Sequence, residues 1–136
     1  MAIISIDLGT KKTGMAISKD PYIVAEDLPI IFESREDKLI GIIKEIILKE
    51  NVDKIVIGVP LNIKGDDTKG SIDNRRIGER LKRALGEDYQ CETIYIDEAM
   101  SSIRAGEYLK KKNGQTSKLD DSISAKILLQ EYLNNI

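Results

Sequence analysis

Three carboxylates in this sequence stand where a fold could bring them together. Asp7 and Glu98 each follow a short apolar run, and Asp121 lies near the start of the last amphipathic segment. None of the 136 residues is a histidine, which excludes histidine acid–base chemistry and histidine zinc sites. Hard oxygen ligands without Cys or His favour Mg²⁺ or Mn²⁺. A cluster of these three acids would therefore form a divalent-metal site able to polarise a phosphate and activate water.

Two of these acids also have purely structural explanations. Asp7 precedes Leu8-Gly9-Thr10, where the chain must turn and where aspartate is a common turn residue. Glu98 and its neighbour Asp97 precede a predicted helix, where acids offset the positive end of the helix dipole. Taken singly, Asp7 and Glu98 fit either interpretation.

Asp121 is the most informative acid, because helical geometry separates it from Asp120. If Ser117 caps the helix, Asp120 occupies the acidic position of a capping box. Asp121 falls on the apolar stripe, where an ionised carboxylate is costly without a cation or a donor. The apolar stripe comprises Ala125, Leu128, Leu129 and Tyr132, and the polar stripe, expected to face water with Asp120, holds Ser124 and Glu131.

The elements that must position these acids follow from hydrophobic periodicity. β-branched alternation and turn residues predict a hairpin, then an irregular third strand interrupted by Pro29. Apolar residues at helical spacing then alternate with two buried strands. The predicted strands are Ala2 to Leu8, Thr13 to Ser18, Tyr22 to Phe32, Lys54 to Val59 and Thr93 to Ile96. The predicted helices run from a Ser34 cap to Asn51, from the 62–71 loop to about Leu85, from Ser101 or Ser102 to Lys112, and from Leu119 to Leu133.

This order predicts an α/β fold with a ribonuclease-H-like layout. A three-strand antiparallel meander is extended by two parallel strands into a mixed five-stranded sheet with helices on both faces. Sites in open α/β sheets usually lie beyond the carboxyl ends of the parallel strands. Asp7 and Glu98 are expected at those ends.

The overall composition is that of one ordinary globular domain spanning residues 1–136. Hydrophobic residues make up 41% and charged residues 32%, and the formal charge is only −2. The protein therefore has no global field for phosphate backbones, and nucleic-acid contacts must come from local patches. The lone Cys91 is expected to be small core filler, and neither a signal peptide nor a membrane span is predicted. A cytoplasmic location is expected.

Several basic residues could supply such local patches. Lys11, Lys12 and Lys64 lie on loops near the expected site and are candidate substrate contacts. Arg76 and Arg80 belong to a basic helix that could bind phosphates or could be an ordinary solvated face. That helix also carries Arg75, Lys82 and Arg83.

The sequence resembles the YqgF or RuvX family, whose members are described as Holliday junction resolvases and as nucleases that mature the small-subunit ribosomal RNA precursor. The matching segments lie in family order over nearly the whole chain. They are Ile6 to Lys11 with Gly14, Val56 to Asn62 with Gly65, Asp97-Glu98, and Asp121 to Ala125 leading to Leu128 to Leu133. The resemblance implies a ribonuclease-H-like fold with Asp7, Glu98 and Asp121 as metal-holding catalytic acids, Mg²⁺ or Mn²⁺ as cofactor, and structured RNA or branched DNA as substrate.

The family pattern differs from this chain in two places. The family commonly has a longer, basic segment before its final acid, whereas Asn113 to Leu119 is short and holds only Lys118. The family usually has an arginine after Asp-Glu, and Ala99 stands there. A divergent nucleic-acid-binding or ribosome-assembly factor with weak or no catalysis is therefore an alternative. A second alternative is an actin-like phosphate-binding or ATP-binding half-domain, since Asp7-Leu8-Gly9-Thr10 also resembles that hairpin. The protein is expected to be a monomer or a homodimer. Junction resolution requires two active sites acting together, so a homodimer would suit that activity, whereas a monomer would favour RNA as the substrate.

Overall fold

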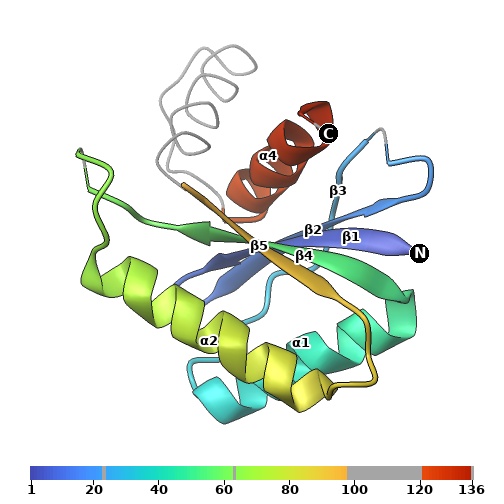
Figure 1. The fold of residues 1–136 in the computed structure, drawn as a ribbon, viewed down its shortest axis with the longest axis horizontal. Helices are drawn as coiled ribbons and strands as arrows, with labels where there is room; N and C mark the ends of the chain where they lie inside the picture. The colour runs from blue at the N-terminus through green and yellow to red at the C-terminus, as the bar shows by residue number, and fades with distance from the viewer. Residues whose placement is uncertain (23, 63, 98–120, 136) are drawn as a thin grey trace.

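A single five-stranded sheet with helices on both faces organises the protein (Figure 1). The computed structural model describes residues 1–22, 24–62, 64–97 and 121–135, with positions 121–123 described by their backbone. In that part of the chain no helix is long and apolar enough to cross a membrane. The predicted helix from Ser101 or Ser102 to Lys112 lies outside the described residues.

The sheet confirms the predicted mixture of antiparallel and parallel strands. Its order is β3-β2-β1-β4-β5, with β1 antiparallel to β2, β2 antiparallel to β3, and β4 parallel to both β1 and β5. The strands are β1 (Ala2–Leu8), β2 (Thr13–Lys19), β3 (Glu26–Asp27), β4 (Val52–Val59) and β5 (Glu92–Asp97). Because β1, β4 and β5 run in one direction, their carboxyl ends meet at one edge of the sheet, which we call the carboxyl edge.

The third strand is much shorter than predicted. The pattern from Tyr22 to Phe32 suggested one irregular strand, but only β3 and an isolated bridge between Thr13 and Ile31 pair with β2. Pro29 lies between the two pairings and has no N–H to donate to a ladder. The segment therefore pairs with β2 twice, as two short pieces.

The helices divide between the two faces of the sheet. Helices α1 (Glu36–Glu50) and α2 (Lys69–Leu85) cover one face, and α4 (Asp121–Asn134) covers the other (Figure 1). The alternation of side chains along each strand supplies an apolar cluster to each face. The cluster on the α1 and α2 face includes Ile4, Ile6, Met15, Ile43, Ile47, Ile55, Ile57 and Leu81. The cluster on the α4 face consists of Ile3, Ala16, Ala25, Val56, Ala125, Leu128, Leu129 and Leu133.

The two ends of α1 show one wrong prediction and one confirmed prediction. The N-cap is Arg35, one residue after the predicted Ser34, and its side chain makes no capping hydrogen bond. Instead, Glu36 and Asp37 occupy the first turn, where acids interact favourably with the helix dipole. Asn51 ends the helix as predicted, in the left-handed conformation at φ 53°, and its N–H donates to the carbonyl of Ile47.

Helix α2 packs on the sheet through a glycine. A Cβ atom added at Gly78 would lie 2.5 Å from Tyr95 Oη and 2.9 Å from Ile57 Cδ1. Only a residue without a side chain therefore allows this close approach of α2 to β4 and β5. The helix ends at Gly86, as predicted, where the N–H of the glycine donates to the carbonyls of Lys82 and Arg83.

The burial of α4 confirms the apolar stripe and corrects the polar one. Ala125, Leu128 and Leu129 are at most 1% exposed, as expected. Ser124, predicted to face water, is only 5% exposed. The helix contacts β1, β2, β3 and β4, so the buried surface is wider than one row of residues. Ser124 is small enough to lie within that surface.

Candidate active site

Asp7 lies at the carboxyl edge, one residue before the end of β1. Its neighbours Ile3 and Ser5, at alternate positions of the strand, face α4, since Ile3 belongs to the α4 cluster and Ser5 Oγ donates to the carbonyl of Ala125 at 2.6 Å. Alternation places Asp7 on the same face. Its side chain is buried, with 6% of the residue exposed.

Glycines flank Asp7 on both neighbouring strands. Gly14 of β2 is its partner in the antiparallel ladder. On β4, the parallel register pairs Ile6 with Ile57, so the next position along that strand is Gly58. Neither neighbour has a side chain to crowd the carboxylate.

The other two predicted ligands fall largely outside the described residues. Glu98 lies beyond the described end of β5, and Asp121 is described only as the first residue of the α4 backbone. Asp97, the last residue of β5, pairs with Val59 and shares the face of Tyr95, which packs toward α2. Within the described chain no three candidate metal ligands come together. The convergence of Asp7, Glu98 and Asp121 stays a prediction.

The β1–β2 turn carries two of the predicted lysines. Lys11 and Lys12 are exposed in the turn that follows β1. A side chain at Gly9 would collide with the carbonyl oxygen of Lys12, so the tight turn requires glycine. Both lysines therefore lie at the carboxyl edge, in the turn that follows the strand of Asp7.

The segment from Pro60 to Thr68, which we call the β4–α2 loop, carries the third lysine. Asn62 Oδ1 accepts hydrogen bonds from the N–H groups of Lys64 and Asp66, each at 2.9 Å. Asn62 also exchanges backbone hydrogen bonds with Gly65 and Asp66. Gly65 adopts φ +83°, which favours glycine. The exposed Lys64 lines an open hollow of about 530 Å³ with Leu61, Asn62 and Asp66.

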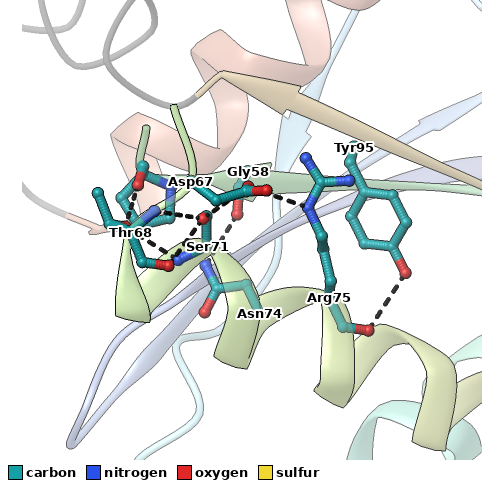
Figure 2. Close-up of polar contacts among 8 residues, drawn as sticks. Gly58, Asp67, Thr68, Ser71, Asn74, Arg75 and Tyr95 are labelled. Carbon is teal, nitrogen blue, oxygen red and sulfur yellow. Dashed lines mark hydrogen bonds and ion pairs between the residues drawn. The ribbon is translucent and has the colours of Figure 1, made fainter. Parts of the chain in front are cut away.

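A second set of hydrogen bonds joins this loop to the start of α2 (Figure 2). Thr68 Oγ1 donates to the carbonyl of Pro60, and Thr68 and Ser71 form a reciprocal capping box. Ser71 Oγ lies 2.9 Å from Asp67 Oδ1. The buried Asn74 side chain donates to the carbonyl of Gly58 at 2.9 Å. These contacts hold the end of β4, the loop and α2 as one unit.

Arg76 and Arg80, the predicted arginine contacts, lie on the side of α2 that faces α1. The guanidinium of Arg76 lies 2.8 Å from Glu36, and that of Arg80 contacts Glu36 and, at 2.7 Å, Asp37. Both arginines therefore join the two helices on the face opposite to Asp7. The structure does not bring them together with the predicted acid.

Arg75 is the arginine of α2 that lies nearest the loop, and the sequence indicated it only as one member of the basic helix. Its guanidinium lies 5.3 Å from the centroid of the Tyr95 ring, and Nε lies 3.6 Å from Asp67 Oδ1 (Figure 2). Tyr95 Oη donates to the carbonyl of Arg75 at 3.4 Å. Helical geometry alone separates Arg75 from Arg76 by about 100°. The two side chains therefore leave the helix in different directions, and this difference was the sequence signal that could have distinguished Arg75 from Arg76.

Cys91 behaves as expected for a packing residue. It is partly buried one residue before β5, and burial raises the pKa of its thiol to about 11. At neutral pH the thiol is protonated, and the thiolate is the nucleophilic form. Cys91 is therefore a poor candidate for covalent catalysis.

Comparison with known sequences identifies relatives along the whole chain. The family model described as RuvX, Holliday junction resolvase, matches residues 1–135. Proteins of Sulfurihydrogenibium sp. (34% identity), Maridesulfovibrio salexigens (35%) and Bacillus cytotoxicus (33%) carry the name "Putative pre-16S rRNA nuclease". The matches cover 98%, 98% and 99% of this chain and 90%, 98% and 99% of those proteins, in the same order.

Solved structures show the same fold at low sequence identity. RuvC of Thermus thermophilus, in complex with a Holliday junction substrate, matches with a TM-score of 0.61 and 9% identity over 99% of this chain and 94% of that chain. The fowlpox virus Holliday junction resolvase matches with a TM-score of 0.59 and 15% identity over all of both chains. These likenesses confirm the predicted ribonuclease-H-like fold.

Proposed function

The chain belongs to the RuvX family, and on that premise we propose that it is a nuclease that hydrolyses phosphodiester bonds in structured RNA, with precursor 16S ribosomal RNA as the substrate class. The observation that carries the proposal is the position of Asp7, a buried carboxylate at the carboxyl edge with a glycine on each neighbouring strand. RNA is preferred because the relatives with full-length sequence similarity are named for it, whereas the structures with bound DNA junctions share only the fold. The proposed location is the cytoplasm.

Asp7, Glu98 and Asp121 would hold Mg²⁺ or Mn²⁺ in this proposal. Carboxylate oxygens suit these hard cations, and the glycines on the neighbouring strands place no side chain beside the Asp7 carboxylate. When bound, such ions polarise the phosphate and lower the pKa of water at the scissile bond.

The chain's own basic residues would position the substrate. Lys11 and Lys12 reach the carboxyl edge from the β1–β2 turn, and Lys64 reaches it from the β4–α2 loop. Each ammonium group can bind a backbone phosphate as a point charge. Asp7, at the end of the neighbouring strand, would then meet the phosphodiester bond that these contacts hold.

The test is cleavage of a structured precursor rRNA fragment by the purified full chain with Mg²⁺ or Mn²⁺. We expect Asp7→Asn to lower the cleavage rate by roughly 100-fold or more, because a neutral amide is a weak ligand for a hard cation. The matched control is Asp20→Asn, an exposed aspartate after β2, which should keep the wild-type rate. Equal cleavage by Asp7→Asn and wild type would overturn the proposal.

Two further results would select other functions. Cleavage of a four-way DNA junction in preference to RNA, by a chain that sediments as a dimer, would assign the resolvase activity that the family description names. Salt-sensitive binding without turnover under either metal would assign a non-catalytic assembly factor, the alternative suggested by Ala99. Monomeric behaviour with RNA cleavage supports the proposal as stated.

A further inference from the structure

Arg75 differs from Arg76 and Arg80 in what neutralises it. Arg76 and Arg80 are joined to Glu36 and Asp37 through their terminal nitrogens. Arg75 faces the opposite way, toward β5, and its ionic contact within the described chain is made by Nε with Asp67 at 3.6 Å. Among the described residues, its two terminal nitrogens make no hydrogen bond, and its side chain is 45% exposed.

The surroundings of Arg75 hold its guanidinium in one orientation. Tyr95 presents its ring 5.3 Å from the guanidinium carbon, and a ring face attracts a cation at this distance. Asp67 restrains the Nε side, and Ser71 Oγ in turn lies 2.9 Å from the same Asp67 oxygen. Because the Nε edge of the guanidinium is held, its two terminal N–H₂ groups stay side by side as a fork of two hydrogen-bond donors.

Such a fork matches the geometry of a phosphate group. Guanidinium binds phosphate with two parallel N–H···O bonds and is more weakly hydrated than an ammonium group. Because its orientation is set by Tyr95 and Asp67 before binding, little side-chain entropy is lost when the contact forms. An arginine that served only to join elements would direct its terminal nitrogens at an acid, as Arg76 and Arg80 do.

The position of Arg75 extends the proposed substrate path. The residue lies on the α2 face of the sheet, opposite to the face of Asp7, beside the β4–α2 loop, which carries Lys64 (Figure 2). It also lies beside β5, the edge strand, whose carboxyl end is at the same edge of the sheet as Asp7. We propose that Arg75 binds a backbone phosphate of the nucleic-acid substrate on the β5 side of the carboxyl edge. Tyr95 and Asp67 act as positioning residues for its guanidinium. This inference rests on the proposed function.

The test measures binding without turnover. Fluorescence anisotropy with a labelled structured RNA, in EDTA and again in Ca²⁺, is followed from about 50 to 200 mM KCl, a range over which phosphate contacts weaken strongly. Arg75→Gln should weaken binding roughly 10-fold at the lowest salt and reduce the slope of log K against log salt by about 0.7 to 0.9. Arg83→Gln, the same change at the other end of α2, should leave both quantities at wild-type values.

Variants of Tyr95 separate positioning from simple charge. Tyr95→Leu removes the ring and should weaken binding about 2- to 5-fold with the salt slope retained, whereas Tyr95→Phe keeps the ring and should bind like wild type. A wild-type slope in Arg75→Gln, or an equal loss in Arg83→Gln, would refute the inference while the nuclease proposal stands. If the wild-type chain binds no nucleic acid, both proposals fail.

Discussion

Helix α4 and the pair α1 and α2 cover opposite faces of one sheet through different kinds of contact. Below α4 the contacts are mainly apolar, and the buried hydroxyl of Ser5 adds one hydrogen bond to the helix backbone. Below α2 an apolar cluster is joined by a buried amide from Asn74, a capping box and ion pairs to α1. Apolar contacts are not directional, whereas hydrogen bonds fix orientation. The α2 face therefore sets the geometry of the loop at the carboxyl edge.

Among changes that test this difference between the two faces, the largest loss of stability is expected from Leu128→Ala on the α4 face. Leu128 is 1% exposed, and truncation of a buried leucine costs about 2 to 5 kcal/mol of the free energy of unfolding. Urea denaturation followed by circular dichroism measures it. Leu48→Ala, at a position that is 45% exposed, should cost less than about 1 kcal/mol. Similar losses in both variants would show that apolar packing does not attach α4.

A smaller effect is expected from Asn74→Ala on the α2 face. The change leaves the carbonyl of Gly58 without its side-chain donor, and an unsatisfied buried group costs about 1 to 3 kcal/mol. Urea denaturation measures the loss, and cleavage should fall as well because Gly58 adjoins Asp7. Asn135→Ala, at an exposed position, should change stability by no more than about 0.5 kcal/mol. Unchanged stability in Asn74→Ala would contradict the claim that buried hydrogen bonds hold the α2 face.

The smallest effect is expected from Glu36→Gln between α1 and α2. Partly exposed ion pairs usually contribute about 0.2 to 1 kcal/mol, and Arg76 and Arg80 both contact this one carboxylate. The destabilisation should therefore be below about 1 kcal/mol per pair and should largely vanish in 1 M NaCl, where screening is strong. Thermal unfolding at two salt concentrations measures it, with the exposed Glu45→Gln as control. A loss that persists at high salt would indicate a hydrogen-bonding role instead.

Local periodicity predicted most of the fold. The apolar run of β1, the unalternating β4 and the helical spacing of Leu39, Ile43 and Ile47 each report directly on burial. The predictions were wrong at positions where tertiary contacts decide which residues are buried and which strands pair. Ser124 is buried because α4 lies on several strands at once, and the segment around Pro29 pairs with β2 in two pieces.

The site was less predictable than the fold. The position of Asp7 followed from strand order, because parallel strands end at one edge. The partners of Arg76 and Arg80 come from α1, about 40 positions earlier in the chain, and no local pattern indicates them. Arg75 stood in the same basic run, and only the packing of α2 on β5 distinguishes it. Glu98 and the side chain of Asp121 lie outside the described residues, and their convergence with Asp7 stays a prediction.

The turn closed by Asn62 has a consequence for how fast a ligand can associate. The backbone N–H groups at 64 and 66 are already bonded to one amide oxygen, so these two residues are held in place before a ligand binds. The conformational entropy of that ordering is lost during folding and not during association. Complex formation at this edge should then proceed at the rate of productive collisions, without a slow rearrangement step.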